Sequence, residues 1–338
     1  ANLKPAYRLT IYLIKDMIDK IKLDLFKLKS KQDLEDVYRF FKESTAKWFD
    51  SNQKPKSEFF HIRGCPLCNA DSSKEVFEID GFSYHKCLSC QSLYTKPHMR
   101  DGVLDALYSD GMYQVYQDNL VKKGKEIRKG VLEQRKYSQI DRLLGKSSPT
   151  LLDIGCGGGT FLDVCKRNGW HVEGVDPSPS ASRSALENYQ INVHHGDFNK
   201  IKFNKTFDVI TLWGVLEHMS DPISAIKKAK ELLNEDGIIV FEVPSADCFI
   251  SKYLKKYNFS PTRYIESGRH NIFFSREVIR QISENFNLKI EYIESNGLDI
   301  QTILLEEFDT KITDKIINIQ DTLNDLLLGD HYRVFLRK

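Results

Sequence analysis

The sequence predicts an α/β protein in which a small metal-binding ribbon and an N-terminal helical segment precede a seven-stranded, largely parallel sheet. Three observations support this prediction. Apolar runs with the length of strands alternate with helical patterns from residue 149 onward, a glycine-rich stretch follows the first of these runs, and four cysteines fall within 26 positions. The 338 residues suffice for more than one domain, since a domain has typically about 150 residues.

Composition and charge exclude several classes of protein. Hydrophobic residues make up 41% and charged residues 28% of the chain, which is the balance of a folded globular protein. No stretch approaches the ~20 apolar residues that cross a bilayer and no signal peptide is recognisable, so we expect a cytoplasmic protein without a transmembrane segment. Lys and Arg number 49 and Asp and Glu 47, and this net charge of +2 argues against a nucleic acid as the partner.

Residues 1–58 are predicted to form an N-terminal helical segment. Apolar residues recur at steps of three and four over residues 11–28 with lysines between them, which is the pattern of an amphipathic helix. Its apolar face is expected to pack on the rest of the protein or on a second copy, as in a homodimer, and its lysine-rich face leaves a membrane surface as an alternative. A second helical pattern follows, with Val37 and Trp48 among its apolar residues, and ends at a polar break over residues 51–57.

Residues 59–98 are predicted to form a zinc ribbon. Two Cys-x-x-Cys pairs separated by eighteen residues have the spacing with which two tight turns present four thiolates to one tetrahedral ion. Zinc suits four sulfurs, and so short a segment cannot bury enough surface to fold unaided. Because four sulfurs leave no position for a water molecule, we expect a structural zinc; a redox dithiol pair and an iron site are the alternatives. The predicted ligands are Cys65, Cys68, Cys87 and Cys90.

Residues 99–148 are predicted to form a helical linker or lid that leads into a domain over residues 149–338. Strands and helices alternate in that domain, which indicates βαβ units and a parallel sheet. The last two strand candidates bracket a helical insertion and are expected to pair antiparallel at the edge of the sheet. The seven candidates are Thr150–Ile154, His171–Val175, Ile191–His195, Phe207–Leu212, Ile238–Val243, Leu288–Ile293 and Tyr332–Arg337.

A glycine-rich loop joins the first of these strands to a helix. It reads DIGCGGGT from Asp153 to Thr160, and its glycines let the backbone approach a ligand closely because they tolerate dihedral angles that other residues do not. A nucleoside-triphosphate loop would carry Gly-Lys-Ser/Thr after the glycines, and a nicotinamide or flavin loop would have glycine in place of Thr160. What remains is an acid at the end of a strand, followed by spaced glycines.

This loop resembles motif I of the class I S-adenosylmethionine-dependent methyltransferases. The resemblance implies a Rossmann-like, seven-stranded methyltransferase sheet over residues 149–338, with S-adenosylmethionine as the cofactor. It also implies which positions bind that cofactor. They are Asp153, Gly155, Cys156, Gly157, Gly159, Asp176, Pro177, Asp197, Phe198 and Trp213.

Further positions that carry the resemblance lie at the ends of successive predicted strands, where open α/β sheets bind ligands. Asp176, after the second strand, is similar to the acid that binds the ribose hydroxyls in that family. Asp197 and Phe198, after the third strand, resemble the acidic and aromatic pair that holds the adenine, and residues 211–218 resemble the motif beside the methionine part. We expect the acids to converge on the sulfonium without a lysine to neutralise them; capping of the following helix is the alternative role for Asp176 and Asp197.

Two histidines are candidates for the general base that takes the proton of a hydroxyl acceptor. His218 lies just past the fourth strand, beside the expected position of the methyl donor, and His270 precedes a helix capped by Ser275. In the subset that the chain resembles, bacterial methyltransferases of sugar and surface-glycan pathways with an N-terminal zinc module, histidines at similar positions line the acceptor pocket. The alternative for each is a hydrogen-bonded structural histidine.

The segment from Pro244 to Asn271 is long for a link between a strand and a helix, and such loops usually carry specificity. Its lysines and arginines are interleaved with aromatic residues, a composition suited to stacking on rings and pairing with phosphate. We therefore expect a small-molecule acceptor, a hydroxyl of a nucleotide-linked sugar or of a precursor in polysaccharide biosynthesis. A zinc-ribbon ribosomal RNA methyltransferase is the alternative, although residues 61–97 lack the basic excess of an RNA-binding ribbon.

Overall fold

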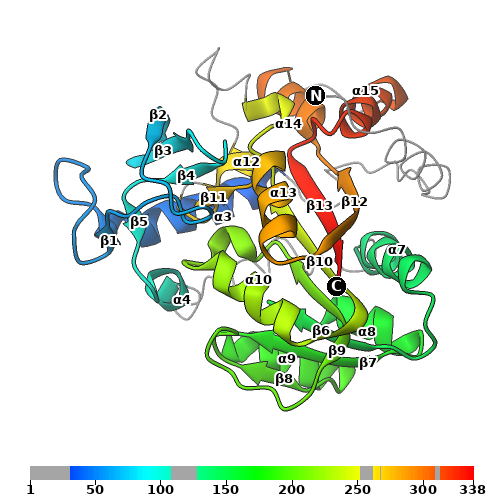
Figure 1. Cartoon of the computed structure of the whole chain (residues 1–338). Helices are drawn as coiled ribbons and strands as arrows, with labels where there is room; N and C mark the ends of the chain where they lie inside the picture. Colours follow the sequence, from blue (N-terminus) through cyan, green and yellow to red (C-terminus); the bar gives the residue numbers. More distant parts are fainter. Residues whose placement is uncertain (1–30, 108–127, 252–261, 267, 309–312) are drawn as a thin grey trace.

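The computed structural model describes residues 31–107, 128–251, 262–266, 268–308 and 313–338. The amphipathic helix predicted over residues 11–28 lies outside these residues, so the homodimer expected through it stays a prediction. A seven-stranded sheet and a smaller four-stranded sheet dominate the described part of the chain, and the smaller sheet lies beside one end of the larger (Figure 1).

The strands of the large sheet match the predicted set, within a few residues at their ends. They are β6 (Thr150–Ile154), β7 (His171–Asp176), β8 (Val193–His195), β9 (Phe207–Trp213), β10 (Leu233–Pro244), β12 (Lys289–Ser295) and β13 (His331–Arg337). Their order is β12-β13-β10-β9-β6-β7-β8. The five strands from β10 to β8 are parallel, while β13 is antiparallel to both β10 and β12. The predicted antiparallel pair is thus confirmed, but only β12 forms the edge because β13 is inserted between β12 and β10.

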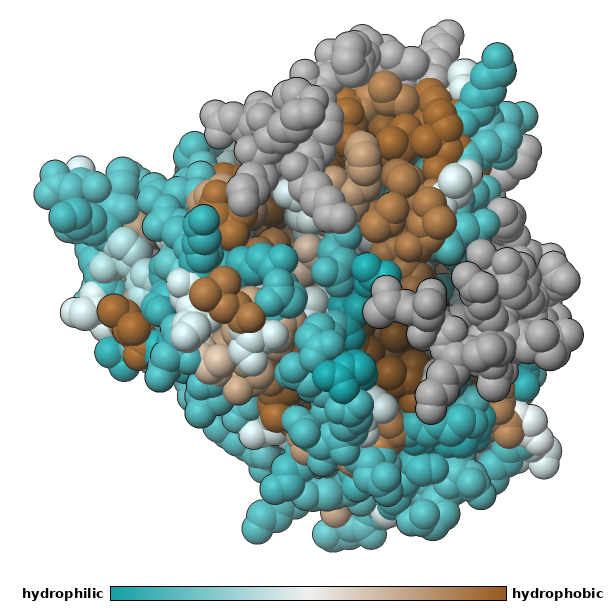
Figure 2. All heavy atoms as spheres, turned by 45° about the horizontal axis from the view of Figure 1, so that its top comes forward, coloured by the Kyte–Doolittle hydropathy of each residue, from teal (hydrophilic) through white to brown (hydrophobic). Residues whose placement is uncertain are grey.

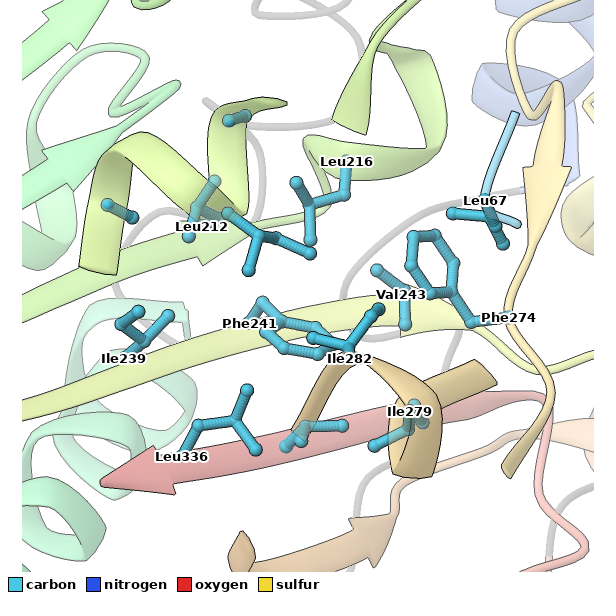
Figure 3. Packing of buried hydrophobic residues seen from close by; sticks show 14 of the residues in the cluster. Leu67, Leu212, Leu216, Ile239, Phe241, Val243, Phe274, Ile279, Ile282 and Leu336 are labelled. Atoms are coloured by element: carbon cyan, nitrogen blue, oxygen red, sulfur yellow. The ribbon is translucent and has the colours of Figure 1, made fainter. Parts of the chain in front are cut away.

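Helices cover both faces of this sheet, as the alternation of strands and helices predicts. Successive residues of a strand point to opposite faces, so Leu151 belongs to one buried cluster and Leu152 to the other, as do Val240 and Phe241. Helices α7 and α8 pack on the first face and α10 and α13 on the second, where Figure 3 shows Phe241 beside Ile282 of α13. The main helices of this domain are α7 (Gln134–Leu144), α8 (Thr160–Arg167), α9 (Pro179–Tyr189), α10 (Pro222–Glu231) and α13 (Arg276–Asn285).

The cysteine ribbon, residues 59–98, is joined to the large domain by strand pairing and by a shared core. Its strands β2 to β4 continue into β11, a strand from the segment before α13, which pairs antiparallel with β4. Thr95 donates its backbone N–H to the carbonyl of Asn271 over 2.9 Å, and Leu67 belongs to the same buried cluster as Phe274 and Val243 (Figure 3). The strands are β2 (Ser73–Ile79), β3 (Phe82–Cys87), β4 (Leu93–Thr95) and β11 (Ile272–Phe273).

The N-terminal helix of the described residues packs on the ribbon and on the loop before β11. Helix α3 (Lys31–Thr45) buries Val37 and Phe41, and Trp48 follows in a short 3-10 turn, all in one cluster with Phe82 and Tyr264. This second core closes the side of the molecule on which the ribbon lies (Figure 1). The other elements are β1 (Phe60–His61), β5 (His98–Met99), α4 (Val103–Leu107), α12 (Thr262–Ile265), α14 (Asp299–Phe308) and α15 (Asp314–Asp325).

The surface in Figure 2 is hydrophilic over most of its lower part, with hydrophobic residues gathered in its upper part. Large apolar side chains that are exposed are few among the described residues, and they are scattered over several elements. Within the same residues, none of the helices has both the length and the apolar character required to cross a membrane.

Candidate active site

A cavity of about 340 Å³ lies at the carboxyl ends of β6, β7 and β9, where the predicted cofactor-binding positions meet. Its volume falls within the range of sites for small ligands, which is roughly 300–1,000 Å³. Three of the predicted positions, Asp153, Cys156 and Gly159, are not on its wall. The predicted positions that line it are Gly155, Gly157, Asp176, Pro177, Asp197, Phe198 and Trp213.

The glycine loop between β6 and α8 depends on glycine at the positions where it turns. Gly155 has φ +69°, and a Cβ there would lie 2.4 Å from a methyl carbon of Val215, so another residue would be strained and would displace Val215. The thiol of Cys156 packs against Gly174 of β7, because a Cβ on that glycine would lie 2.4 Å from the sulfur. The Cys156 side chain therefore faces the sheet, and only its backbone is available to a ligand of the loop.

Asp153 lies beneath the loop at the end of β6. Its carboxylate is buried and accepts a hydrogen bond of 2.7 Å from the hydroxyl of Thr211 on the neighbouring strand β9. Burial raises the pKa of Asp153 to about 7, against the lowering effect of the Thr211 hydrogen bond and of the Lys136 ammonium. The geometry indicates that Asp153 fixes the base of the loop to the sheet.

Asp176 and Asp197 lie at the cavity with different surroundings. Asp176 is buried and accepts the backbone N–H of Gly157 and of Ser178, each over 2.9 Å, and burial raises its pKa. The N-cap of α9 is Ser178, whose hydroxyl accepts from the N–H of Ala181. Asp197 is more accessible and forms an ion pair with Lys200 at 3.3 Å. The expectation that no lysine neutralises these acids is therefore wrong for Asp197, because the turn after β8 brings a lysine three residues further on to its carboxylate.

The two predicted histidines are neighbours, and only one of them reaches the cavity. His218 lines the cavity, whereas His270 lies behind it with the ring centroids 5.3 Å apart. The Nδ1 of His218 donates to the carbonyl of Arg269 over 2.6 Å, and the Nδ1 of His270 donates to the carbonyl of Tyr264 over 2.8 Å. Burial lowers the pKa of His218 to about 3 and that of His270 to about 4, so both rings are neutral near pH 7.

Glu217 lies close to both histidines, and the three side chains form a group of potential ligands. One ligand atom from each of the three lies within 4.8 Å of the others. Burial raises the pKa of Glu217 to about 8, and its Oε2 is buried without a hydrogen-bond partner within the described part of the chain. The Oε1 of Glu217 lies 3.9 Å from the Nε2 of His218. This distance is longer than a hydrogen bond, so the carboxyl and the imidazole are neighbours without a direct bond between these two atoms.

Two aromatic side chains that line the cavity are each fixed by cations. The ring of Trp213 lies 4.6 Å from the Lys136 ammonium and 5.3 Å from the Arg333 guanidinium, and the ring of Phe198 lies 4.7 Å from the Lys228 ammonium. Contacts of this kind stabilise a ring by about 0.5–2 kcal/mol, depending on how far the cation is desolvated. The aromatic walls of the cavity are thereby held in place.

The four cysteines of the ribbon have the geometry of a tetrahedral metal site. The Sγ of Cys65 lies 3.7 Å from that of Cys90, and the Sγ of Cys68 lies 3.5 Å from that of Cys87. All four sulfurs lie within 4.8 Å of one another. Zinc–sulfur bonds of about 2.3 Å in a tetrahedron place the sulfurs about 3.8 Å apart, so the donor set fits zinc. None of the four lines the cavity, which agrees with a structural role.

One wall of the cavity comes mostly from residues of the ribbon to which the sequence analysis gave no role. They follow or precede the cysteine pairs in the ribbon, and they reach the cavity because β4 pairs with β11. No local sequence motif marks these residues as binding residues. His98, for example, directly follows Pro97 and belongs to no recognisable motif. The ribbon residues on this wall include Arg63, Thr95 and His98. Arg100 follows directly after the ribbon, and the loop before β11 adds Arg269 and Asn271.

The long loop predicted to carry specificity is described only in part. Residues 252–261 lie outside the described residues, as do the side chains of Thr262 and Arg263. Tyr264 is fully buried and donates its hydroxyl to the carbonyl of Ser245 over 2.6 Å, so its ring belongs to the core. Arg269 is the basic residue of this loop that lines the cavity.

Parts of the chain are similar to known methyltransferases. The ubiquinone biosynthesis O-methyltransferase of Actinobacillus pleuropneumoniae is 36% identical over 126 residues, which are 34% of this chain and 50% of that protein. That of Pelagibacter ubique is 26% identical over 194 residues, covering 52% of this chain and 75% of that protein. The first relatives are thus matched over about half their length.

Among solved structures, magnesium protoporphyrin IX methyltransferase from Synechocystis PCC 6803, solved with bound S-adenosylhomocysteine, aligns with 71% of this chain and 100% of its own, with TM-score 0.48 and 15% identity. Residues 128–293 match the family described as "Methyltransferase domain". This match covers the glycine loop, the strand-end acids and five of the seven strands in full. Residues 128–293, just under half of the chain, therefore resemble a methyltransferase domain.

Proposed function

We propose that the protein is an enzyme that transfers a methyl group from S-adenosylmethionine to a hydroxyl oxygen of a small molecule. The observation that carries the proposal is a single cavity whose wall contains the glycine loop, two strand-end acids and a neutral histidine. When bound, S-adenosylmethionine supplies an electrophilic methyl group on a sulfonium. The name of the relatives, O-methyltransferase, supports oxygen as the methylated atom.

The cofactor is proposed to lie along the carboxyl ends of β6, β7 and β8. Asp176 would accept hydrogen bonds from the ribose hydroxyls, since its carboxylate lies at the cavity and its described partners are backbone N–H groups. Asp197 and Phe198 would hold the adenine from the next strand. The backbone of Gly155 and Gly157 allows the close approach that the methionine part needs.

His218 is proposed to be the general base. Its Nδ1 donates to a backbone carbonyl, so in the neutral ring Nε2 carries the lone pair that can take the acceptor proton. Glu217 lies next to Nε2, with its Oε1 3.9 Å away. His270 is proposed to act with His218 from behind, by holding its ring in place, since the two rings are in contact. The rest of the acceleration would come from holding the acceptor oxygen in line with the methyl group.

The acceptor is proposed to be a nucleotide-linked sugar or a related glycan precursor. Three arginines on the cavity wall, Arg63, Arg100 and Arg269, support an acceptor that carries phosphate. A quinone precursor is the second candidate, because the relatives are named for ubiquinone biosynthesis. The four cysteines are proposed to bind one structural zinc ion, which fits their spacing.

A transfer assay with methyl-labelled S-adenosylmethionine tests this proposal. The protein would be incubated with nucleotide sugars, with phenolic quinone precursors and with ribosomal RNA, and label would be followed into each pool. We expect label in the nucleotide sugars and none with an Asp176→Asn variant. Label in the phenolic pool would replace the acceptor by the second candidate. Label in RNA alone would contradict a small-molecule acceptor.

A further inference from the structure

We propose that the cysteine ribbon builds the acceptor side of the cavity, where His98 accepts a hydrogen bond from an acceptor hydroxyl and Arg63 binds an oxyanion of the same acceptor. The oxyanion is a phosphate or a carboxylate. This inference rests on the proposed methyl transfer, and it gives the ribbon a direct part in binding the substrate.

His98 carries the strongest sign of a missing ligand. It lies on β5, lines the cavity and is only 5% exposed, yet its Nε2 is buried without a hydrogen-bond partner among the described residues. Its ring is fixed by stacking on Tyr94, with centroids 5.2 Å apart and an angle of 10° between the planes. Leaving a buried polar atom without a partner carries a cost in stability. A ligand atom in the cavity would remove this cost.

The tautomer of His98 indicates whether the missing ligand atom donates or accepts a hydrogen bond. Burial and the neighbouring Arg63 lower the pKa of His98 to about 4, so the ring is neutral near pH 7. Hydrogen bonding to the backbone at Gly64 and Arg63 opposes this shift, which means that carbonyls accept from the ring there. We assign the proton of the neutral ring to Nδ1, because Nε2 is the ring nitrogen without a partner among the described residues. Nε2 carries a lone pair, and its natural partner is a hydroxyl of the acceptor.

Arg63 supplies the positive charge of this wall. It lines the same cavity, and its Nη2 donates to the carbonyl of Ser220, which anchors one end of the guanidinium. Its Nε is buried without a partner within the described residues. A guanidinium with one end anchored and donors left over is suited to a phosphate or carboxylate.

The charges on the cavity wall also favour an anionic acceptor on the ribbon side. The acidic side chains that line it, Asp176 and Asp197, belong to the cofactor side, whereas Arg63 and Arg100 belong to the ribbon side. No acidic side chain of the described ribbon residues lines the cavity. A cationic methyl donor and an anionic acceptor would therefore each face the opposite charge.

The ribbon places both side chains through its metal-binding turn. β1 pairs antiparallel with β5 so that His61 faces His98, and Arg63 follows two residues after His61, immediately before the turn that begins the first cysteine pair. A metal ion on the four cysteines would fix this turn and with it the position of Arg63. A metal site at the edge of the cavity would then serve to position a substrate-binding side chain.

Calorimetry on the full chain tests the inference, with S-adenosylhomocysteine at saturation and glucose 1-phosphate, glucuronate and glucose as probes. We expect glucose 1-phosphate or glucuronate to bind more tightly than glucose, and the tighter of the two identifies the oxyanion. His98→Phe keeps the ring but removes the acceptor atom, and should weaken binding of that probe about tenfold. His85→Phe is the matched control, because His85 also stacks on Tyr94 but does not line the cavity, and it should leave binding unchanged.

Arg63→Gln provides a second variant, which should abolish the preference for the charged probe over glucose. Zinc content and S-adenosylhomocysteine affinity, both expected to be unchanged, show that each variant is folded. Unchanged probe binding in His98→Phe and Arg63→Gln overturns the inference, as does binding of neither charged probe. If S-adenosylhomocysteine itself does not bind to the unmodified chain, it is the proposed function that fails.

Discussion

The substitution His218→Asn removes the proposed base but keeps its hydrogen bond to the backbone. The asparagine amide can replace the Nδ1 donor that bonds to the carbonyl of Arg269, but it has no atom at the position of Nε2. Positioned general bases contribute about 10²–10⁴-fold in rate. We therefore expect turnover to fall at least about 10²-fold, equivalent to about 3 kcal/mol in the barrier. Cofactor affinity should change little, because the acids that are proposed to bind it lie on other strands.

The assay is single-turnover methyl transfer at saturating cofactor and acceptor, with calorimetry for the cofactor. His194→Asn is the matched control, since His194 lies on β8 and does not line the cavity. Because burial holds the pKa of His218 near 3, the rate of the unmodified enzyme should show no loss of this base between pH 8 and pH 6. A His218→Asn variant that turns over at the unmodified rate would refute the role of His218.

Three further predictions concern the metal, the loop and the buried acid. Cys87→Ser should lower zinc content below one ion per chain and expose residues 61–97 to protease while cofactor affinity stays within a few-fold; unaltered protease resistance in zinc-free protein would contradict this. Gly155→Ala should weaken cofactor binding at least tenfold by calorimetry because its Cβ would overlap a valine methyl group, whereas Gly145→Ala, with nothing within 4 Å, should not. The folded pKa of Glu217 is raised to about 8, so ionisation costs stability as pH rises from its unfolded pKa toward 8. The unfolding free energy of Glu217→Gln relative to the unmodified chain should therefore increase by about 2 kcal/mol between pH 6 and pH 8 in urea titrations, and a constant difference would show that the carboxyl is not held protonated.

Most of the fold could be predicted from the sequence because local patterns determine it. Strands such as β6 and β9 are short apolar runs between helical patterns. This alternation is enough to predict a parallel sheet. The place of β13 could not be read from pairing rules, because a strand at the end of the chain can join either edge. A signal was nevertheless present: Val334, Phe335 and Leu336 are a continuous apolar run, and all three are fully buried, as expected of an interior strand.

The cofactor half of the site follows from the sequence, whereas the acceptor half does not. Glycines and acids at the ends of successive strands meet because parallel strands bring their carboxyl ends to one edge. The ribbon wall depends instead on the pairing of Tyr94 with Ile272, which are far apart in the chain and carry no pattern that links them. Arg63 and His98 reach the cavity through that pairing. His270 lies behind His218, on the loop before β11, and its part in catalysis stays a prediction.

Calorimetric titration of the full chain with S-adenosylhomocysteine, and in parallel of Asp176→Asn, tests the central claim most directly. The account predicts one binding site per chain and a 10- to 100-fold weaker affinity in the variant, the loss of a charge-assisted hydrogen bond of about 1.5–3 kcal/mol. Equal affinity in both proteins, or binding of a dinucleotide or nucleoside triphosphate in place of the sulfur-containing nucleoside, would contradict it.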